Sequence, residues 1–136
     1  MKEDHTKEEL IQYRIKKARD TFNTARHLAE KSDDGNSIAN RLYYAAFYCV
    51  ISLLAKEEIE YKSHKSVKTA LSNFYIRTGL LDNFFGAMYG KLFDMRQGGD
   101  YEDYFDISLD KIKPYIEQVE QFIVAVEGLL TENTEG

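Results

Sequence analysis

The amino-acid sequence predicts an all-α protein that folds as an antiparallel up-and-down bundle of about five helices. Apolar residues recur at intervals of three and four along most of the chain, which is the period of an amphipathic helix. The 136 residues contain a single proline, and a chain with few helix breakers can form long helices. Short polar stretches separate the periodic segments, and short connections place consecutive helices side by side.

The first predicted helix spans residues 6–31, where the apolar residues fall on one stripe. The stripe consists of Ile11, Ile15, Ala18, Phe22, Ala25 and Ala29. The stretch KSDDGNS that follows is rich in turn formers, and we expect Asn36 or Ser37 to cap the second helix.

The second predicted helix, IANRLYYAAFYCVISLLAKEEI from Ile38 onward, is apolar around most of its circumference. A helix that is apolar on several sides is covered by its neighbours, so we expect this one to be the central helix. One of its faces carries Cys49, which we interpret as a core-packing residue.

A shorter third helix is predicted to begin near residues 63–65. Glycine readily adopts the left-handed conformation that terminates helices, so we expect this helix to end at Gly79. Its apolar positions are Val67, Leu71, Phe74 and Tyr75.

The fourth predicted helix is capped by Asp82, reaches Arg96 and is expected to break at Gly98 and Gly99. Its apolar stripe is Phe85, Met88, Leu92 and Met95, with Tyr89 beside it.

The fifth predicted helix covers about residues 108–130, with Pro114 either in its first turns or at a kink. Its apolar positions are Ile112, Ile116, Val119, Ile123, Val126 and Leu130. We interpret the terminal TENTEG as a frayed tail. The chain has no internal repeat or interdomain linker, so residues 1–136 form one domain whose core covers about residues 6–130.

The formal net charge of −5 gives the molecule a field that does not attract polyanions. Nucleic-acid binding would therefore need a local basic patch. The candidates are YRIKKAR at residues 13–19 and YKSHKSVK at residues 61–68, and a solvated helix face is the alternative interpretation of both.

The sequence predicts a cytoplasmic protein without membrane association. A single cysteine cannot form an internal disulfide, which favours a reducing compartment. The charged start MKEDHTKEEL lacks the apolar core of a secretion signal. No apolar stretch approaches the ~20 residues that are needed to cross a bilayer.

Two arginines on apolar helix faces are candidate functional residues, and the first is Arg96. It lies four residues after Leu92 and so continues the inward stripe of the fourth helix. One interpretation is a local clamp, in which Arg96 satisfies the last helix carbonyls and pairs with Asp100 or Asp103. The other is that its planar guanidinium binds a phosphate.

The second candidate, Arg41, shares a face of the second helix with Tyr44 and Tyr48. It either forms an ion pair with an acid of the first or last helix, or it supports phosphate binding beside Arg96.

Three segments carry a resemblance that covers roughly residues 10–130. They are ANRLYYAAFY in the second helix, HKSVKTALSNFYIRTGLL across the third, and KLFDMRQGGDY at the end of the fourth. In this order they resemble the HEPN superfamily, specifically the small prokaryotic HEPN proteins encoded beside minimal nucleotidyltransferases. The resemblance implies a helical bundle that pairs as a homodimer. It also implies a cleft at the dimer interface, where the fourth-helix arginines face each other.

Many members of this superfamily are metal-independent ribonucleases, and the resemblance places Arg96 at their phosphate-binding arginine. Their motif has a histidine four to six residues later, whereas residues 97–103 of this chain contain no histidine. Tyr101 or an acid stands in its place, and a phenol with an ordinary pKa of ~10 is a poor proton shuttle at neutral pH. We therefore predict that ribonuclease activity is absent or very weak. A degenerate active site would use Arg96 and Tyr101.

The site that we predict for a nucleotide or RNA phosphate consists of Arg96, Arg41, Asp100, Tyr101 and His64. An alternative role for His64 is to cap the third helix or to bond a neighbouring helix. No metal-ligand spacing is present, and we predict neither a metal nor a cofactor.

The resemblance also implies partners. In related pairs the nucleotidyltransferase modifies a tyrosine near this motif with AMP, which makes Tyr101 and Tyr104 candidate modification sites. We expect a noncatalytic HEPN protein that works with a separately encoded nucleotidyltransferase in a toxin–antitoxin-like or defence-related pair. The alternatives are a HEPN ribonuclease toxin with a degenerate active site and a purely structural dimerisation module.

Overall fold

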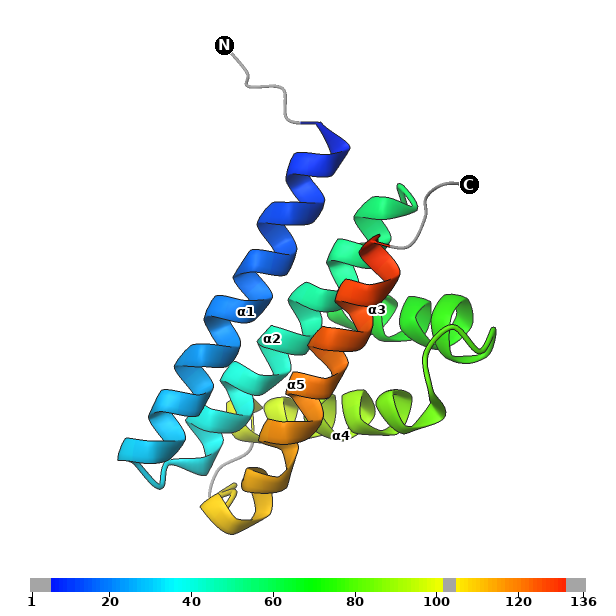
Figure 1. Ribbon diagram of the computed structural model, residues 1–136. Coiled ribbons are helices and arrows are strands. Elements are labelled where there is room, and N and C mark those ends of the chain that lie inside the picture. Colours follow the sequence, from blue (N-terminus) through cyan, green and yellow to red (C-terminus); the bar gives the residue numbers. More distant parts are fainter. Residues whose placement is uncertain (1–5, 102–104, 132–136) are drawn as a thin grey trace.

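The structure, a computed structural model, describes residues 6–101 and 105–131, and for Asp100 and Tyr101 it describes the backbone only. This part of the chain contains five α-helices, one short π-helical segment and no strand (Figure 1). The elements are α1 (Lys7–Lys31), α2 (Gly35–Lys56), α3 (His64–Leu71), the π-helical η1 (Ser72–Ile76), α4 (Asn83–Tyr101) and α5 (Leu109–Thr131). The predicted all-α bundle is confirmed.

The central helix is α2, as predicted, because it contacts α1, α3, α4 and α5. α1 lies antiparallel to it, whereas α5 runs parallel to it (Figure 1). Accordingly, Lys56 at the end of α2 donates a hydrogen bond of 2.9 Å to the carbonyl oxygen of Leu129 near the end of α5. In Figure 1, α4 crosses α2 and α5 steeply near the bottom of the view. This crossing returns the chain to the end of the bundle where α2 begins.

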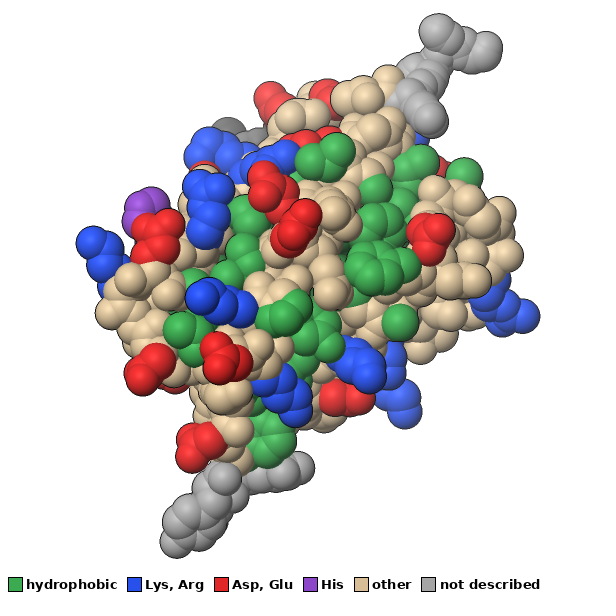
Figure 2. Space-filling model, turned by 60° about the horizontal axis from the view of Figure 1, so that its bottom comes forward, with side chains coloured by type: hydrophobic (Ala, Val, Ile, Leu, Met, Phe, Trp, Pro, Cys, Tyr) green, Lys and Arg blue, Asp and Glu red, His purple; other side chains and the backbone are tan. Residues whose placement is uncertain are grey.

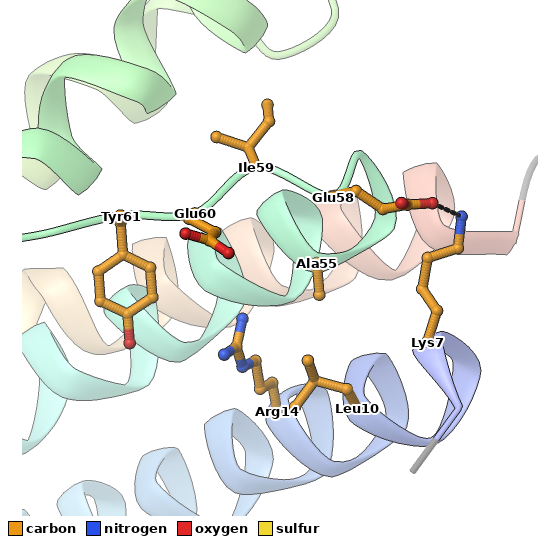
Figure 3. A pocket seen from close by; sticks show the side chains of 8 residues that line it. All are labelled: Lys7, Leu10, Arg14, Ala55, Glu58, Ile59, Glu60 and Tyr61. Carbon is orange, nitrogen blue, oxygen red and sulfur yellow. Dashed lines mark hydrogen bonds and ion pairs between the residues drawn. The ribbon is translucent and has the colours of Figure 1, made fainter. Parts of the chain in front are cut away.

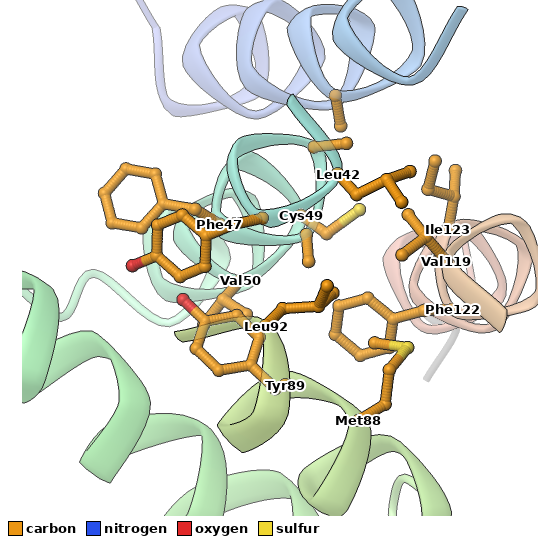
Figure 4. Close-up of a cluster of buried hydrophobic side chains, with 14 of the residues drawn as sticks. Leu42, Phe47, Cys49, Val50, Met88, Tyr89, Leu92, Val119, Phe122 and Ile123 are labelled. Carbon is orange, nitrogen blue, oxygen red and sulfur yellow. The ribbon is translucent and has the colours of Figure 1, made fainter. Parts of the chain in front are cut away.

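The core lies where α2 faces α4 and α5 (Figure 4). Cys49 of α2 is fully buried there, in agreement with a packing role, and burial raises the pKa of its thiol. Burial of apolar surface between α2 and the helices around it, including α1 with Phe22 and Ala25, is the main driving force for the fold. The buried side chains labelled in Figure 4 are Leu42, Phe47, Cys49, Val50, Met88, Tyr89, Leu92, Val119, Phe122 and Ile123.

By length and composition, α2 could also cross a bilayer, and within the described part of the chain it is the one helix of this kind. The expectation that no stretch approaches that length was therefore wrong. Of its most apolar window, 78% is buried inside the protein. The apolar surface of α2 is thus used in packing against the other helices.

α2 begins earlier than predicted, and its cap is Asp34 rather than Asn36 or Ser37. One carboxylate oxygen of Asp34 accepts a 3.1 Å hydrogen bond from the backbone N–H of Ser37, and the other accepts one of 2.7 Å from the Ser37 hydroxyl. These hydrogen bonds lower the pKa of the Asp34 carboxyl. A carboxylate also suits the partial positive charge at a helix N-terminus, which favours Asp34 as the cap.

Asn36 lies inside the first turn of α2 and joins it to the segment that precedes α5. Its side-chain nitrogen donates to the carbonyl oxygen of Phe105 at 2.7 Å, and its side-chain oxygen accepts from the N–H of Ile107 at 2.8 Å. The neighbouring Gly35 lies so close to this segment that a Cβ atom there would collide with the Ile107 carbonyl. We call this contact between the start of α2 and residues 105–107 the Asn36 clamp.

α4 continues through Gly98 and Gly99 to Tyr101, so the prediction that these glycines break the helix was wrong. A glycine inside a helix costs ~1 kcal/mol relative to alanine but does not end the helix by itself. A Cβ atom on Gly98 would lie 2.5 Å from the ring of Phe105, and one on Gly99 would lie 3.7 Å from the Asn36 side chain. Gly98 therefore allows a close contact with Phe105 and does not turn the chain.

The end of the third helical segment also differs from the prediction. Residues 72–76 form a π-helical turn, which is wider than an α-helical one and displaces the side chains from the predicted stripe. As a result Phe74, one of the apolar positions of the predicted helix, is 48% exposed. Tyr75 is buried, and its hydroxyl donates to the carbonyl oxygen of Leu53 at 3.2 Å. Gly79 has a φ of +82°, as expected for the terminating residue.

Charged side chains of both signs are interspersed on the face shown in Figure 2, while hydrophobic side chains gather in a patch on the right of that view. No extended area of a single charge is visible on this face. This distribution is consistent with the net charge of −5, and binding of an anion would depend on local groups rather than on the overall field.

Replacing Gly35 with alanine should destabilise the protein, although alanine is the better helix former. The added Cβ atom would collide with the Ile107 carbonyl and strain the Asn36 clamp, which should cost about 1–3 kcal/mol. Gly128→Ala is the matched control, because a Cβ atom on this exposed residue of α5 would meet nothing within 4 Å. It should stabilise by up to about 1 kcal/mol. Urea unfolding of both variants measures these changes, and a neutral or stabilising Gly35→Ala would contradict the close contact.

Candidate functional site

A pocket of about 410 Å³ lies where the C-terminal half of α1, the first turns of α2 and the C-terminal turns of α4 meet. Arg41 and Arg96, which the sequence singled out on two different helices, both line it. The other lining residues are Thr24, Leu28, Asn36, Ser37, Asn40, Met95 and Gly99. The fold therefore brings the two candidate arginines to one site, which we call the arginine pocket.

Two tyrosines of α2 form an aromatic wall beside the arginines. The guanidinium carbon of Arg41 lies 5.4 Å from the ring centroid of Tyr44, and that of Arg96 lies 5.8 Å from the same ring. Arg96 also lies 5.1 Å from the centroid of Tyr43. Cation–π contacts of this kind hold a guanidinium in a fixed orientation without neutralising its charge.

Arg41 is not in the ion pair that we considered as its alternative role. Its Nε and Nη2 atoms donate to the side-chain oxygen of Asn40 at 3.2 and 2.8 Å. No carboxylate of the described residues pairs with Arg41. A neutral amide thus orients the guanidinium of Arg41, and its positive charge remains available to an anion.

Arg96 is half-buried and lies on the inward side of α4, as the stripe predicted. It is not at the helix end, because α4 continues to Tyr101. The pairing of Arg96 with Asp100 or Asp103 stays a prediction. The proposed partners Asp100 and Asp103, like the candidate tyrosines Tyr101 and Tyr104, have side chains outside the described part of the structure.

His64 does not line the arginine pocket but adjoins the aromatic wall. It is the first residue of α3, and the cap of this helix is Ser63. Its Nδ1 atom lies 2.7 Å from the hydroxyl of Tyr43, and its ring stacks on that of Phe47 with centroids 4.5 Å apart. The bond that we considered from His64 to a neighbouring helix is therefore present, and it joins α3 to α2.

Burial and the nearby charge of Arg96 both lower the pKa of His64 from its ordinary value of 6.5, so the imidazole is neutral at physiological pH. Burial raises the pKa of Tyr43 to about 12, which keeps this phenol protonated. The pair can therefore share a single neutral hydrogen bond between the hydroxyl and Nδ1.

A larger hollow of about 670 Å³ lies at the other end of α1 (Figure 3). It is less suited to a phosphate, because Glu58 and Glu60 line it and the Nζ atom of Lys7 already pairs with Glu58 at 3.1 Å. Its Arg14 is held by the carbonyl oxygen of Ile51 at 2.8 Å. Charge therefore favours the smaller arginine pocket as the anion site.

Sequence reasoning missed Asn40 and Tyr43 as parts of this site. Asn40 is adjacent to Arg41 in the chain, and neighbouring residues do not ordinarily face each other on a helix. Tyr43 lies on an apolar face of α2, and its ring is fully buried. A helical wheel does not show that the ring of Tyr43 also contacts the guanidinium of Arg96.

Comparisons with known proteins agree with this architecture. A family model described as the HEPN domain matches residues 11–129. A UPF0332 protein from Thermotoga maritima is 31% identical over 126 residues, which cover 93% of this chain and 95% of that protein. Two proteins from Methanocaldococcus jannaschii, each named a "putative toxin", are 28% and 27% identical. The matches cover 69% and 68% of this chain, and 69% of each relative.

The pKa of His64 should report the charge of Arg96. Because burial and Arg96 lower the pKa of His64, the unfolded chain takes up this proton first as the pH falls through about 6.5. The contribution of His64 to the free energy of unfolding is therefore lost as the pH falls from about 6.5 to the lower pKa that His64 has in the folded chain. Arg96→Gln should raise the pKa of His64, whereas Lys91→Gln, which removes an exposed cation from the same helix, should leave it unchanged. NMR titration of the His64 ring measures both, and equal shifts in the two variants would show that Arg96 is not the cause.

Proposed function

The chain belongs to the HEPN domain family, and from that premise we propose that it is a noncatalytic member that binds the phosphate of a nucleotide or an RNA in the arginine pocket. In this proposal it works with a separately encoded nucleotidyltransferase in a toxin–antitoxin-like or defence-related pair, in the cytoplasm.

The observation that carries the proposal is the convergence of Arg41 and Arg96 on one pocket. Two guanidiniums offer planar, forked donors that match phosphate oxygens. Arg41 supports this use most directly, because only the amide oxygen of Asn40 and the ring of Tyr44 contact its charge within the described residues. A phosphate in the pocket would supply a negative charge to Arg41.

The proposal of a noncatalytic role rests on the proton-exchanging side chains near the pocket, since none that is described there suits proton transfer at neutral pH. Cleavage of RNA by its own 2′-hydroxyl requires a group that exchanges a proton near neutral pH, close to the phosphate. Residues 97–103 contain no histidine. His64 is directed to the hydroxyl of Tyr43 and does not line the pocket. With a pKa of about 12, Tyr43 holds its proton too tightly to act as a neutral-pH acid.

The remaining parts of the proposal follow from the family. A homodimer of HEPN chains would bring two arginine pockets toward a shared cleft and so double the positive charge available to a polyanion. A partner nucleotidyltransferase would transfer AMP to Tyr101 or Tyr104. Tyr101 follows Arg96 by five residues in the same helix, α4, and therefore belongs to the end of α4 that carries the pocket.

A second candidate function is a ribonuclease toxin with a degenerate active site that uses Arg96 and Tyr101. The names of the two Methanocaldococcus jannaschii relatives favour it, since both are called toxins. The third alternative, a structural dimerisation module, would leave the arginine pocket without a ligand.

Arg41→Ala and Arg96→Ala should each weaken the binding of ATP or a short RNA. Loss of a charge-assisted hydrogen bond to phosphate corresponds to about a tenfold to hundredfold weaker affinity. Lys91→Ala is the control, because it removes an exposed cation from α4 without touching the pocket. Calorimetric titration of both ligands measures the affinities. Binding that persists in both arginine variants would place the anion site elsewhere.

The purified protein should not cleave RNA in the absence of metal ions, and Arg96→Ala should not change that result. The reason is that the described residues of the arginine pocket include no proton carrier of suitable pKa. Incubation with labelled single-stranded RNA in a chelator measures cleavage. Cleavage that wild type performs and Arg96→Ala lacks would instead establish the ribonuclease candidate.

A further inference from the structure

A second hollow of about 460 Å³ adjoins the arginine pocket on the surface between α1 and α2. The two hollows share Thr24 and Arg41 as lining residues, so a molecule bound in one can extend into the other. The second hollow is lined mainly by α1, from Tyr13 through Lys17 to Thr24. We call it the α1 groove.

The charge of the α1 groove suits a polyanion. Among its lining residues, Lys16 pairs with Asp20 at 2.8 Å, and these two charges offset each other. Lys17 and Arg41 remain, and no carboxylate of the described residues pairs with either. The groove thus carries two uncompensated cations within a protein whose net charge is −5. Such a local patch attracts phosphates despite the overall field.

Tyr13 lines the groove, and Tyr48 and Tyr44 of α2 adjoin it through their contacts with Lys17 and Arg41. The Nζ atom of Lys17 is 5.7 Å from the ring centroid of Tyr13 and 5.7 Å from that of Tyr48. The rings of Tyr48 and Tyr44 follow each other along α2 with centroids 6.1 Å apart, and the ring of Tyr44 in turn contacts the guanidinium of Arg41. Tyr13 is 62% exposed, so at least one ring presents an open face.

Cations that alternate with accessible aromatic rings are the chemistry that recognises single-stranded nucleic acid. The cations follow the phosphates, and the rings stack on the bases whatever the sequence. A duplex would not fit this pattern, because its bases are already stacked and offer no free face.

We propose that the α1 groove binds single-stranded nucleic acid and extends the arginine pocket, so that the site holds an oligonucleotide rather than a mononucleotide. This inference rests on the proposed function, because the oligonucleotide places one phosphate between Arg41 and Arg96. Its neighbouring nucleotides lie along Lys17 and stack on Tyr13 and Tyr48.

The experiment compares AMP with a fluorescently labelled RNA of about ten nucleotides, a DNA of the same sequence and an RNA duplex. Anisotropy and calorimetry measure their affinities for the full chain. We expect the single-stranded RNA to bind at least about tenfold more tightly than AMP and the duplex, because each stacked base adds affinity. Single-stranded DNA that binds equally well assigns the groove to either nucleic acid and still supports the inference. Equal affinity for AMP and the single strand would overturn it.

Variants of exposed groove residues separate this inference from the proposed function. Lys17→Gln and Tyr13→Ser should each weaken the binding of the single strand by about fivefold or more and leave AMP binding unchanged. Both side chains are exposed, so the fold should survive their replacement. Tyr48→Leu tests the half-buried ring, and Lys91→Gln is the matched control for lost charge.

Three further outcomes distinguish failure of this inference from failure of the proposed function. If both groove variants bind the single strand as wild type does, the inference fails while the arginine pocket stands. If wild type binds neither AMP nor RNA, both proposals fail. If Lys17→Gln or Tyr13→Ser instead changes the oligomeric state in light scattering, the groove is a contact between copies of the chain, and the inference is overturned.

Discussion

The Asn36 clamp is the contact on which the arrangement of the candidate site depends. One side-chain amide uses both of its polar groups on the backbone of residues 105–107, and so it joins the start of α2 to the lead into α5. A Cβ atom on Gly99 would lie 3.7 Å from this same side chain, which places the end of α4 against it. Arg41 lies five residues after the clamp and Arg96 three residues before Gly99. Two helices that are distant in sequence therefore present their arginines to one pocket.

The aromatic wall has a different role, which is to orient the two guanidiniums. The ring of Tyr44 contacts both of them without contributing a negative charge. A carboxylate in the place of this ring would cancel charge that a phosphate needs. Tyr43 extends the wall and is itself held by His64 of α3. The third helix thus contributes to the site without lining it.

The periodicity of apolar residues was sufficient to predict the five helices and the central position of α2, because packing a helix requires a contiguous apolar surface. It failed where glycines and polar side chains make tertiary contacts. Gly98 was read as a helix breaker, since the sequence does not reveal that Phe105 needs the space of its missing side chain. Asn36 was read as a cap, since its partners lie about seventy residues away. Arg41 and Arg96 were singled out by position on apolar faces, but a helical wheel could not show their convergence.

The wall around Tyr44 has a consequence for the folded state itself. The ring of Tyr44 contacts Arg41 without adding a negative charge, and no carboxylate of the described residues pairs with that arginine. An anion bound at Arg41, if it binds only the folded chain, adds to the free energy of unfolding by mass action. The empty protein is then the more fragile form, more open to heat and to proteases. The amount of folded protein in the cell would then rise with the supply of the ligand, because ligand binding and folding are coupled in one equilibrium.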